Sequence, residues 1–222
     1  METRTPSGNR LRVPGRSFRR EAVRIKTLRS VPIERQAVST GDATPTVLIV
    51  EDEQHLADLY TDYLADSYDV RTAYSGEEGI ERLSEDIDVV LLDRRMPVVS
   101  GNEVLAEIEE RSLPCRVAMV TAVNPDFDII EMGVDDYLVK PVTREELTDV
   151  IERLQKIAAY NEQLQELTTR KLKRNVLQVE MTQTELERSQ RYRQLQTEIA
   201  EISERVDELA ADLDVEEEDL RL

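Results

Sequence analysis

Five polar side chains stand at or just beyond the ends of short apolar runs. They are Glu51, Asp52, Asp93, Thr121 and Lys140. Such runs are typical of buried strands in a parallel sheet, whose carboxyl ends meet at one edge. Three carboxylates, a hydroxyl and an ammonium group at one edge suit Mg²⁺-dependent transfer of a phosphoryl group to an aspartate. The pattern therefore predicts a phosphorylation site.

Asp93 is the predicted nucleophile. Its carboxylate can attack phosphorus only if the charge of the incoming group is offset, because two unit charges 4 Å apart repel by about 4 kcal/mol at an effective dielectric constant near 20. A cation held by Glu51 and Asp52 would remove this penalty, and Mg²⁺ commonly takes only one or two carboxylates. Mg²⁺ is therefore the expected cofactor.

Two further side chains are expected to bind the phosphoryl oxygens. Thr121 can donate a hydrogen bond to one oxygen, and Lys140 can neutralise another. Pro141 predicts a turn, for which a cis peptide bond is one candidate, that directs Lys140 back into the site. Taken singly, each of these residues has an ordinary structural explanation as a cap, a strand residue or a surface charge. Their shared position at strand ends favours a common site.

Strands and helices are expected to alternate from residue 46 to about residue 154. Strands are predicted at 47–50, 69–73, 89–92, 116–120 and 137–139, and helices at 53–65, 75–83, 101–108, 127–132 and from Thr143 onward. Leu56, Leu59 and Leu64 are expected to face the core, and Ser75 with Glu78 resembles a capping box. Five βα units predict a doubly wound α/β fold with its ligands at the strand carboxyl ends.

The chain becomes purely helical after residue 157. Apolar residues with alternating spacings of four and three form a coiled-coil seam: Tyr192, Leu195, Ile199, Ile202, Val206, Leu209 and Leu213. An earlier stretch carries its apolar residues less regularly: Leu164, Leu167, Leu172, Val176 and Val179. A soft break is expected near 182–184. Either a helical hairpin or a long helix that pairs between chains would bury these seams.

Charge is distributed unevenly. The net charge is −18, but residues 1–45 carry ten basic and four acidic side chains, which leaves −24 on the rest of the chain. Only five of the 29 basic residues are Lys. Such a chain suits a high-salt cytoplasm, where charge is screened within a few ångströms. The single cysteine, Cys115, excludes an intramolecular disulfide, and no apolar run approaches the roughly 20 residues that span a membrane.

Residues 1–45 show no sustained periodicity and form a predicted basic, disordered extension. Two interpretations stay open for them: a basic arm, or a translation start placed too far upstream. The segment that begins at Val38, immediately before the first strand, looks like a natural start if its codon is GTG. The second interpretation is favoured.

Residues 46–157 resemble the receiver domain of two-component response regulators. The matching motifs are Val-Glu51-Asp52-Glu53, Leu-Leu-Asp93-Arg-Arg-Met-Pro97 followed by Gly101, Val-Thr121-Ala, and Gly-Val-Asp-Asp-Tyr137-Leu-Val-Lys140-Pro141. The resemblance implies a flavodoxin-like sheet in the order 2-1-3-4-5. It also implies that a sensor histidine kinase is the partner that phosphorylates Asp93.

The same resemblance implies roles for individual residues. Asp52 and Asp93 would bind Mg²⁺, Glu51 would act through water, and the backbone carbonyl of Arg95 would complete the metal site. Thr121 and Tyr137 resemble the switch pair that moves on phosphorylation. Glu51 replaces the more common Asp, and Arg95, two positions past the acceptor, affects the expected lifetime of the phosphorylated state.

Residues 158–222 resemble the HalX output region of haloarchaeal regulators in position, helicity and acidity. The first hypothesis is a non-enzymatic switch whose helical tail binds a protein or forms a homodimer. The alternative is a DNA-binding transcription regulator, which the negative charge disfavours. Seven basic residues near the predicted bend could still support DNA binding: Arg170, Lys171, Lys173, Arg174, Arg188, Arg191 and Arg193. A phosphoaspartate-dependent hydrolase is disfavoured because Arg95 occupies the position of its second aspartate. His55, the only histidine, is expected to face solvent.

Overall fold

The computed structural model describes residues 44–123 and 132–213. Its first part is a five-stranded parallel sheet in the order β2-β1-β3-β4-β5, which confirms the predicted topology. The strands are β1 (Thr46–Val50), β2 (Asp69–Ala73), β3 (Val89–Leu92), β4 (Arg116–Thr121) and β5 (Asp136–Val139). The predicted extension before residue 44, most of the 127–132 helix and the end of the chain after residue 213 lie outside the described residues.

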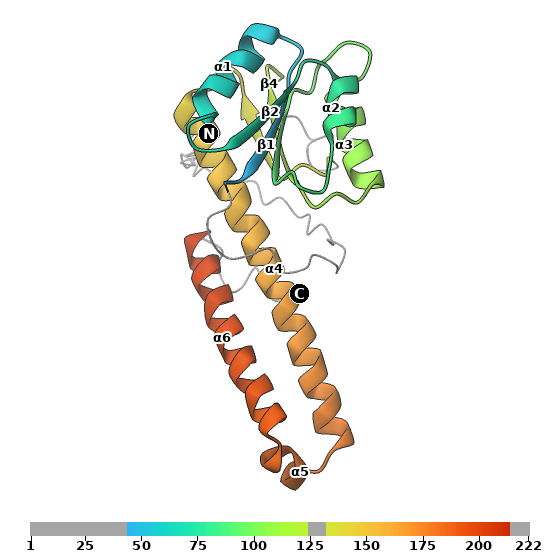
Figure 1. Cartoon of the computed structure of the whole chain (residues 1–222), viewed down its shortest axis with the longest axis vertical. Coiled ribbons are helices and arrows are strands. Elements are labelled where there is room, and N and C mark those ends of the chain that lie inside the picture. Colours follow the sequence, from blue (N-terminus) through green and yellow to red (C-terminus); the bar gives the residue numbers. More distant parts are fainter. Residues whose placement is uncertain (1–43, 124–131, 214–222) are drawn as a thin grey trace, which may run out of the picture.

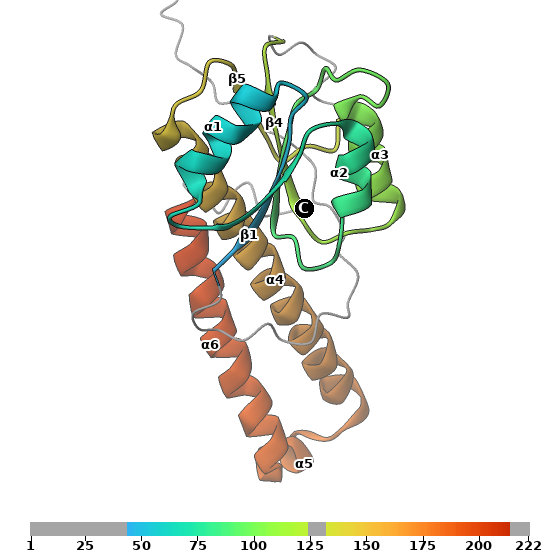
Figure 2. The same ribbon diagram turned by 45° about the horizontal axis from the view of Figure 1, so that its top comes forward.

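Helices cover both faces of the sheet (Figures 1 and 2). The described helices are α1 (Gln54–Leu64), α2 (Gly76–Arg82), α3 (Gly101–Glu110), α4 (Arg144–Glu180), α5 (Gln183–Arg188) and α6 (Gln190–Asp212). Alternate strand residues point to opposite faces, so Val47 and Ile49 pack with α1 and the start of α4, whereas Leu48 and Val50 pack on the side of α2 and α3. Burial on both faces explains why β1, β3 and β4 read as continuous apolar runs.

Backbone hydrogen bonds extend beyond the strand ends and fix the residues that follow. The amide of Glu51 donates to the carbonyl of Ala73 at 3.1 Å, and that of Asp93 donates to Val50 at 2.9 Å. The amide of Lys140 donates to Thr121 at 2.9 Å. The parallel register therefore brings the three polar residues to one edge of the sheet.

Two local predictions need correction. The buried residues of α1 are Ala57, Tyr60 and Leu64, whereas Leu59 is 39% exposed because its position lies about 100° around the helix from Tyr60. Ser75 does accept a hydrogen bond from the amide of Glu78, but the Glu78 carboxylate accepts from the amide of Tyr74 instead of completing the box at Ser75.

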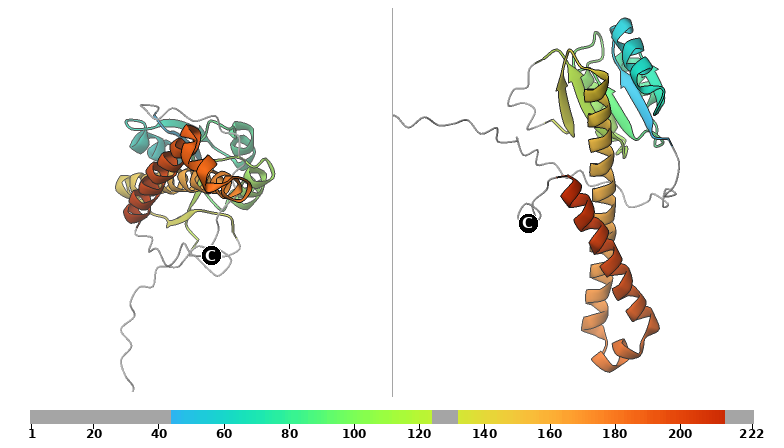
Figure 3. Two further views of the ribbon diagram at one scale, coloured as in Figure 1. Left: turned by 90° about the horizontal axis from the view of Figure 1, so that it is seen from below. Right: turned by 90° about the vertical axis from the view of Figure 1, so that its left-hand side faces the viewer.

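The C-terminal region is a helical hairpin continuous with the α/β domain. Thr143 caps α4 in a capping box with Glu146, and the helix then runs for 37 residues without interruption. The chain turns through α5, where a second capping box joins Thr182 to Glu185, and α6 returns along α4 (Figure 3). The predicted break near 182–184 therefore falls within the turn. No described helix is both long and apolar enough to cross a membrane.

The hairpin is held together by an apolar seam near the sheet. Its buried members are Tyr160, Leu167, Ile199, Ile202, Val206 and Ala210, with Leu164, Leu195, Leu209 and Leu213 partly buried against them. The coiled-coil seam predicted from the spacing of apolar residues in α6 agrees with these buried and partly buried positions. The hairpin does not bury the apolar residues of the far half of α4: Leu172, Val176 and Val179 are 60%, 61% and 82% exposed.

Candidate functional site

Three carboxylates form the centre of the site. Glu51 and Asp52 follow β1, and Asp93 follows β3; one oxygen from each lies within 4.8 Å of the others. Glu51 and Asp93 are buried, whereas Asp52 is exposed at the mouth of the site. Carboxylate oxygens are the ligands that Mg²⁺ prefers, and an exposed ligand leaves room for the waters that it retains. The donor set therefore fits the predicted cation.

Lys140 reaches this cluster from the end of β5. Its Nζ atom lies 2.5 Å from Glu51 Oε2 and 2.7 Å from Asp93 Oδ2. The Lys140–Pro141 peptide bond is cis, which was one candidate for the turn predicted at Pro141. One ammonium group thus bridges the predicted acceptor and one predicted metal anchor, and the three carboxylates leave the site with an excess of negative charge.

The pKa values of Glu51 and Lys140 reflect this excess of negative charge. The pKa of Glu51 is raised to about 7, because burial and the charge of Asp93 together outweigh the opposing contacts with Lys140. Burial would lower the pKa of Lys140, but its hydrogen bonds to Asp93 and Glu51 outweigh burial and the net shift is upward. Both shifts favour a positive charge here, so a divalent cation would complete the site electrostatically.

The loop after β3 holds Asp93 through its backbone. The amide of Arg95 donates to Asp93 Oδ1 at 3.2 Å, while the Arg95 side chain is exposed. Gly101 lies so close that a Cβ atom there would meet the Asp93 carbonyl oxygen at 2.1 Å. This close approach explains why glycine is needed at that position of the motif.

The two predicted switch residues are connected through a third residue. The Thr121 hydroxyl, buried at the end of β4, accepts from the amide of Val123 at 3.4 Å. The Tyr137 hydroxyl donates to the carbonyl oxygen of Val123 at 2.8 Å. Sequence reasoning missed Val123, because only its backbone takes part and an apolar residue carries no signal for that role.

β5 is also tied to α4. Asp136 accepts a hydrogen bond from the amide of Tyr137 at 2.7 Å through Oδ1, and from Arg153 Nε at 2.7 Å through Oδ2. Arg153 lies on the part of α4 that covers the sheet. Tyr137 is therefore one residue away from an ion pair with the helix that continues into the hairpin.

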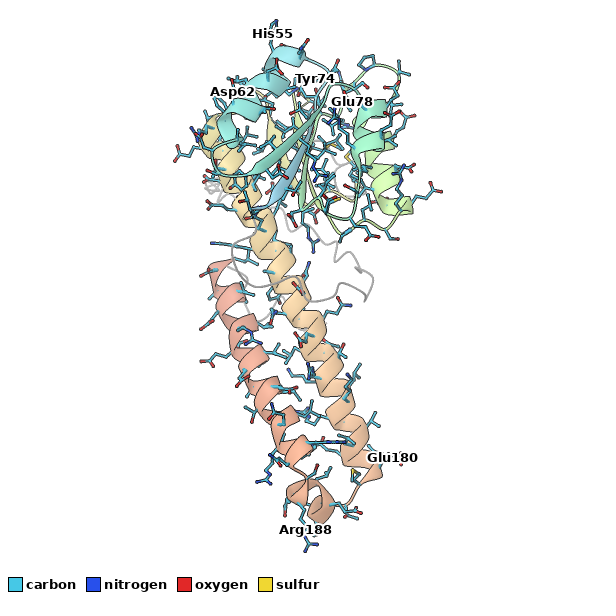
Figure 4. The ribbon with its side chains drawn as sticks, in the orientation of Figure 1. His55, Asp62, Tyr74, Glu78, Glu180 and Arg188 are labelled. Carbon is cyan, nitrogen blue, oxygen red and sulfur yellow. The ribbon has the colours of Figure 1, made fainter. Side chains whose placement is uncertain are left out.

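Other polar groups lie apart from the site. His55 is exposed near the start of α1, as predicted (Figure 4). A shallow hollow between α4 and α6 lies far from the carboxylates; it is lined by Arg170, Gln190, Arg191, Gln194, Leu195 and Glu198. Cys115 is buried in the core.

Comparison with protein families matches two successive segments of the chain. Residues 47–152 match the model described as the response regulator receiver domain. Residues 156–222 match the model described as the HalX domain. Together the two matches extend from β1 to the last residue.

Individual relatives match about half of the chain. A putative transcriptional regulator of Haloferax volcanii is 51% identical over 121 residues, which cover 54% of this chain and 21% of that protein. Transcriptional regulatory protein CutR of Streptomyces coelicolor is 43% identical over 106 residues, 46% of this chain and 49% of that protein. The chain thus spans half or less of these curated relatives.

Among solved structures, the signal receiver domain of a putative LuxO repressor protein from Vibrio parahaemolyticus is similar. The two sequences are 30% identical. The match covers 54% of this chain and 96% of that domain, with a TM-score of 0.48.

Proposed function

We propose that this chain, which belongs to the response regulators through its receiver and HalX domains, accepts a phosphoryl group on Asp93 and transmits the resulting change to its helical hairpin. The observation that carries this proposal is the position of the Asp93 carboxylate. It lies 2.7 Å from Lys140 Nζ and within 4.8 Å of two further carboxylates, at the carboxyl edge of a parallel sheet.

The transfer itself needs little from the protein beyond positioning and charge. An Asp93 oxygen forms the new bond to phosphorus, while the bond from phosphorus to the imidazole nitrogen of a kinase histidine breaks and that nitrogen keeps the electron pair. Mg²⁺, held by Asp52, Asp93, the Arg95 carbonyl and Glu51 through water, would supply the charge that the phosphoryl oxygens require. Lys140 is placed to pair with one of these oxygens. The role is that of a phosphoacceptor, with at most self-phosphorylation and self-dephosphorylation as activities of its own.

Phosphorylation would change the partners of two side chains. Lys140, shared between Glu51 and Asp93, would turn toward the new phosphoryl oxygens, and Thr121 would exchange its weak 3.4 Å contact for a charge-assisted hydrogen bond. Because Val123 contacts both Thr121 and Tyr137, movement at Thr121 would disturb the hydrogen bond of the Tyr137 hydroxyl. The neighbouring pair between Asp136 and Arg153 would carry the change to α4.

The length of α4 suits this role. The helix begins three residues after Pro141 and ends at the far tip of the hairpin, so a small tilt at the sheet becomes a larger displacement at the tip. Amide hydrogen exchange of the full chain, with Mg²⁺ and with or without beryllofluoride as a phosphoryl mimic, tests this coupling. We expect altered exchange around 121–123 and 136–139 and along α4. A change confined to the Asp93 loop would contradict it.

We favour a protein partner or a second copy of the chain as the target of the hairpin. At least two of the seven basic residues near the bend lie on different sides of α4. Lys171 and Lys173 are two residues apart and so project about 200° from each other around α4. Arg170 is engaged by Glu166 and Glu198.

DNA binding is the alternative output, supported by the names of the two curated relatives. Crosslinking and immunoprecipitation of a tagged protein in cells, beside an Asp93→Ala version, separates the two proposals. Protein partners without discrete DNA peaks are the expected result. DNA peaks that disappear in the variant would establish a phosphorylation-controlled transcription regulator instead.

A further inference from the structure

An apolar stripe lies on the far half of α4 with no covering element among the described residues. It consists of Leu172, Val176 and Val179, which are 60%, 61% and 82% exposed and are spaced by four and three residues. This spacing keeps the three side chains on one side of the helix and is the spacing of a coiled-coil seam. We propose that the stripe joins two copies of this chain, with their α4 helices antiparallel.

The stripe faces away from the hairpin's own partner helix. On the inner side of this half of α4, Arg170 pairs with Glu198 and Gln178 donates to the Tyr192 hydroxyl at 3.0 Å. Polar contacts therefore fill the positions where apolar residues would close the hairpin. At 100° per residue, Val176 lies almost opposite the buried Leu167. The hairpin itself cannot bury the stripe.

At the positions that border the stripe in coiled-coil spacing, charged residues occur on one edge only, and Lys171 lies farther around the helix. Lys173 follows Leu172 directly and Glu180 follows Val179 directly, so both lie on the same edge, seven residues apart. Glu180 is on the side of α4 away from α6 (Figure 4). The opposite edge carries the uncharged Thr168 and Asn175.

This arrangement distinguishes between the two ways of pairing a second copy. In an antiparallel pair related by a two-fold axis across the stripe, each edge faces the same edge of the other helix. With Val176 near the axis, Lys173 faces the partner's Glu180 and Glu180 faces the partner's Lys173. In a parallel pair the charged edge would face the uncharged edge, and neither ion pair would form. The charge pattern therefore fits an antiparallel second copy.

The proposed contact is small and therefore reversible. Burial of three aliphatic side chains offsets only part of the cost of association. Stable interfaces bury about 800 Å² on each partner, more than three side chains and one charged edge supply. We expect a dissociation constant in the micromolar range. Association of this kind does not depend on phosphorylation of Asp93, so it is tested without a phosphodonor.

Sedimentation of the full chain at increasing concentration measures the pairing. The experiment uses about 0.15 M salt, where the screening length is about 8 Å. Lys173→Glu alone and Glu180→Lys alone each place like charges opposite each other and should weaken association about fivefold to tenfold. The double swap restores opposite charges and should recover the wild-type constant. Lys171→Glu is the matched control, because it makes the same charge change off the edge of the stripe; it should have little effect.

A crosslink gives a second test. In Val176→Cys the new thiols lie close to the two-fold axis, so mild oxidation should yield a covalent dimer, whereas native Cys115 is buried and should not react. Circular dichroism checks that each variant keeps its helices. A wild-type chain that stays monomeric at high micromolar concentration overturns the proposal. So does a double swap that fails to recover association, or a Val176→Cys chain that forms no covalent dimer.

Discussion

The hydroxyl group of Tyr137 is joined to the carbonyl oxygen of Val123 by a 2.8 Å hydrogen bond, two residues beyond Thr121. Val123 also donates through its amide to the Thr121 hydroxyl. The end of β4 and the aromatic residue of β5 are thus linked through one backbone unit. This link connects the end of β4 to β5, whose Asp136 pairs with Arg153 of α4.

Replacing Tyr137 by Phe tests this link. The loss of one neutral hydrogen bond should lower the free energy of unfolding by about 1 kcal/mol. Phosphorylation of Asp93 should proceed to the wild-type extent, but amide exchange along α4 should no longer respond to beryllofluoride. Tyr74→Phe is the control, since the Tyr74 hydroxyl donates to Asp58 at the surface, away from α4. A normal α4 response in Tyr137→Phe would show that the hydrogen bond is not needed.

The raised pKa of Glu51 predicts a dependence of stability on pH. Without Mg²⁺, the neutral carboxyl favours folding, so this contribution is complete below the ordinary value of 4.5 and is lost as pH rises through about 7. Glu51→Gln keeps the neutral form at every pH. Compared with this variant, the wild-type chain should lose at most about 3 kcal/mol of unfolding free energy between pH 4.5 and 8. Denaturant titrations across this range measure the difference.

The affinity for Mg²⁺ should rise with pH, whereas the stability of the chain without Mg²⁺ should fall. Binding requires ionised Glu51, so affinity should fall below about pH 7 and binding there should release protons. Calorimetry in two buffers with different heats of ionisation counts these protons. An affinity that is constant between pH 6 and 8, with no proton release, would show that Glu51 does not sense the cation.

Val98 is expected to be a strained residue. It is 88% exposed and has a φ of 66°, a left-handed backbone conformation that β-branched side chains rarely adopt. Val98→Gly should therefore raise the free energy of unfolding by about 1 kcal/mol. Val139→Gly, in the edge strand β5, should lower it. Loss of stability in Val98→Gly would mean that the valine side chain makes contacts that outweigh the strain.

The buried ion pair between Arg116 and Asp135 should dominate stability at the start of β4 and β5. Arg116 Nη1 lies 3.1 Å from Asp135 Oδ1, and the two side chains are only 4% and 8% exposed. Asp135→Ala would leave the guanidinium buried without its partner and should cost about 3–5 kcal/mol. Glu107→Ala, which breaks the surface pair with Arg111, should cost less than about 1 kcal/mol. Similar losses in thermal unfolding of the two variants would contradict this ranking.

The sequence predicted the sheet well because its three inner strands, β1, β3 and β4, are fully buried and each leads into or ends at a polar residue of the site. The parallel register then brings together residues as distant as Glu51 and Lys140, which topology alone makes predictable. The roles of Val123 and of the Asp136–Arg153 pair were not predictable, because the first acts through its backbone and the second depends on tertiary contact.

The hairpin shows a limit of periodicity. Leu167 and Leu172 both belong to an apolar pattern, yet one is buried against α6 and the other points away. A spacing of three and four identifies a stripe but not which side of the helix meets its partner. The polar pairs Arg170–Glu198 and Gln178–Tyr192 decide that side, and they appear only once both helices are placed.

The most direct test of the account is the site of phosphorylation. The full chain would be incubated with a small-molecule phosphodonor such as acetyl phosphate, with Mg²⁺ or with a chelator, and analysed by intact-protein mass spectrometry beside Asp93→Asn. We predict one phosphoryl group per chain, only with Mg²⁺ and only when Asp93 is present, and lost in alkali as expected for an acyl phosphate. Equal incorporation in Asp93→Asn, or incorporation that does not require Mg²⁺, would contradict Asp93 as the acceptor in a metal-dependent site.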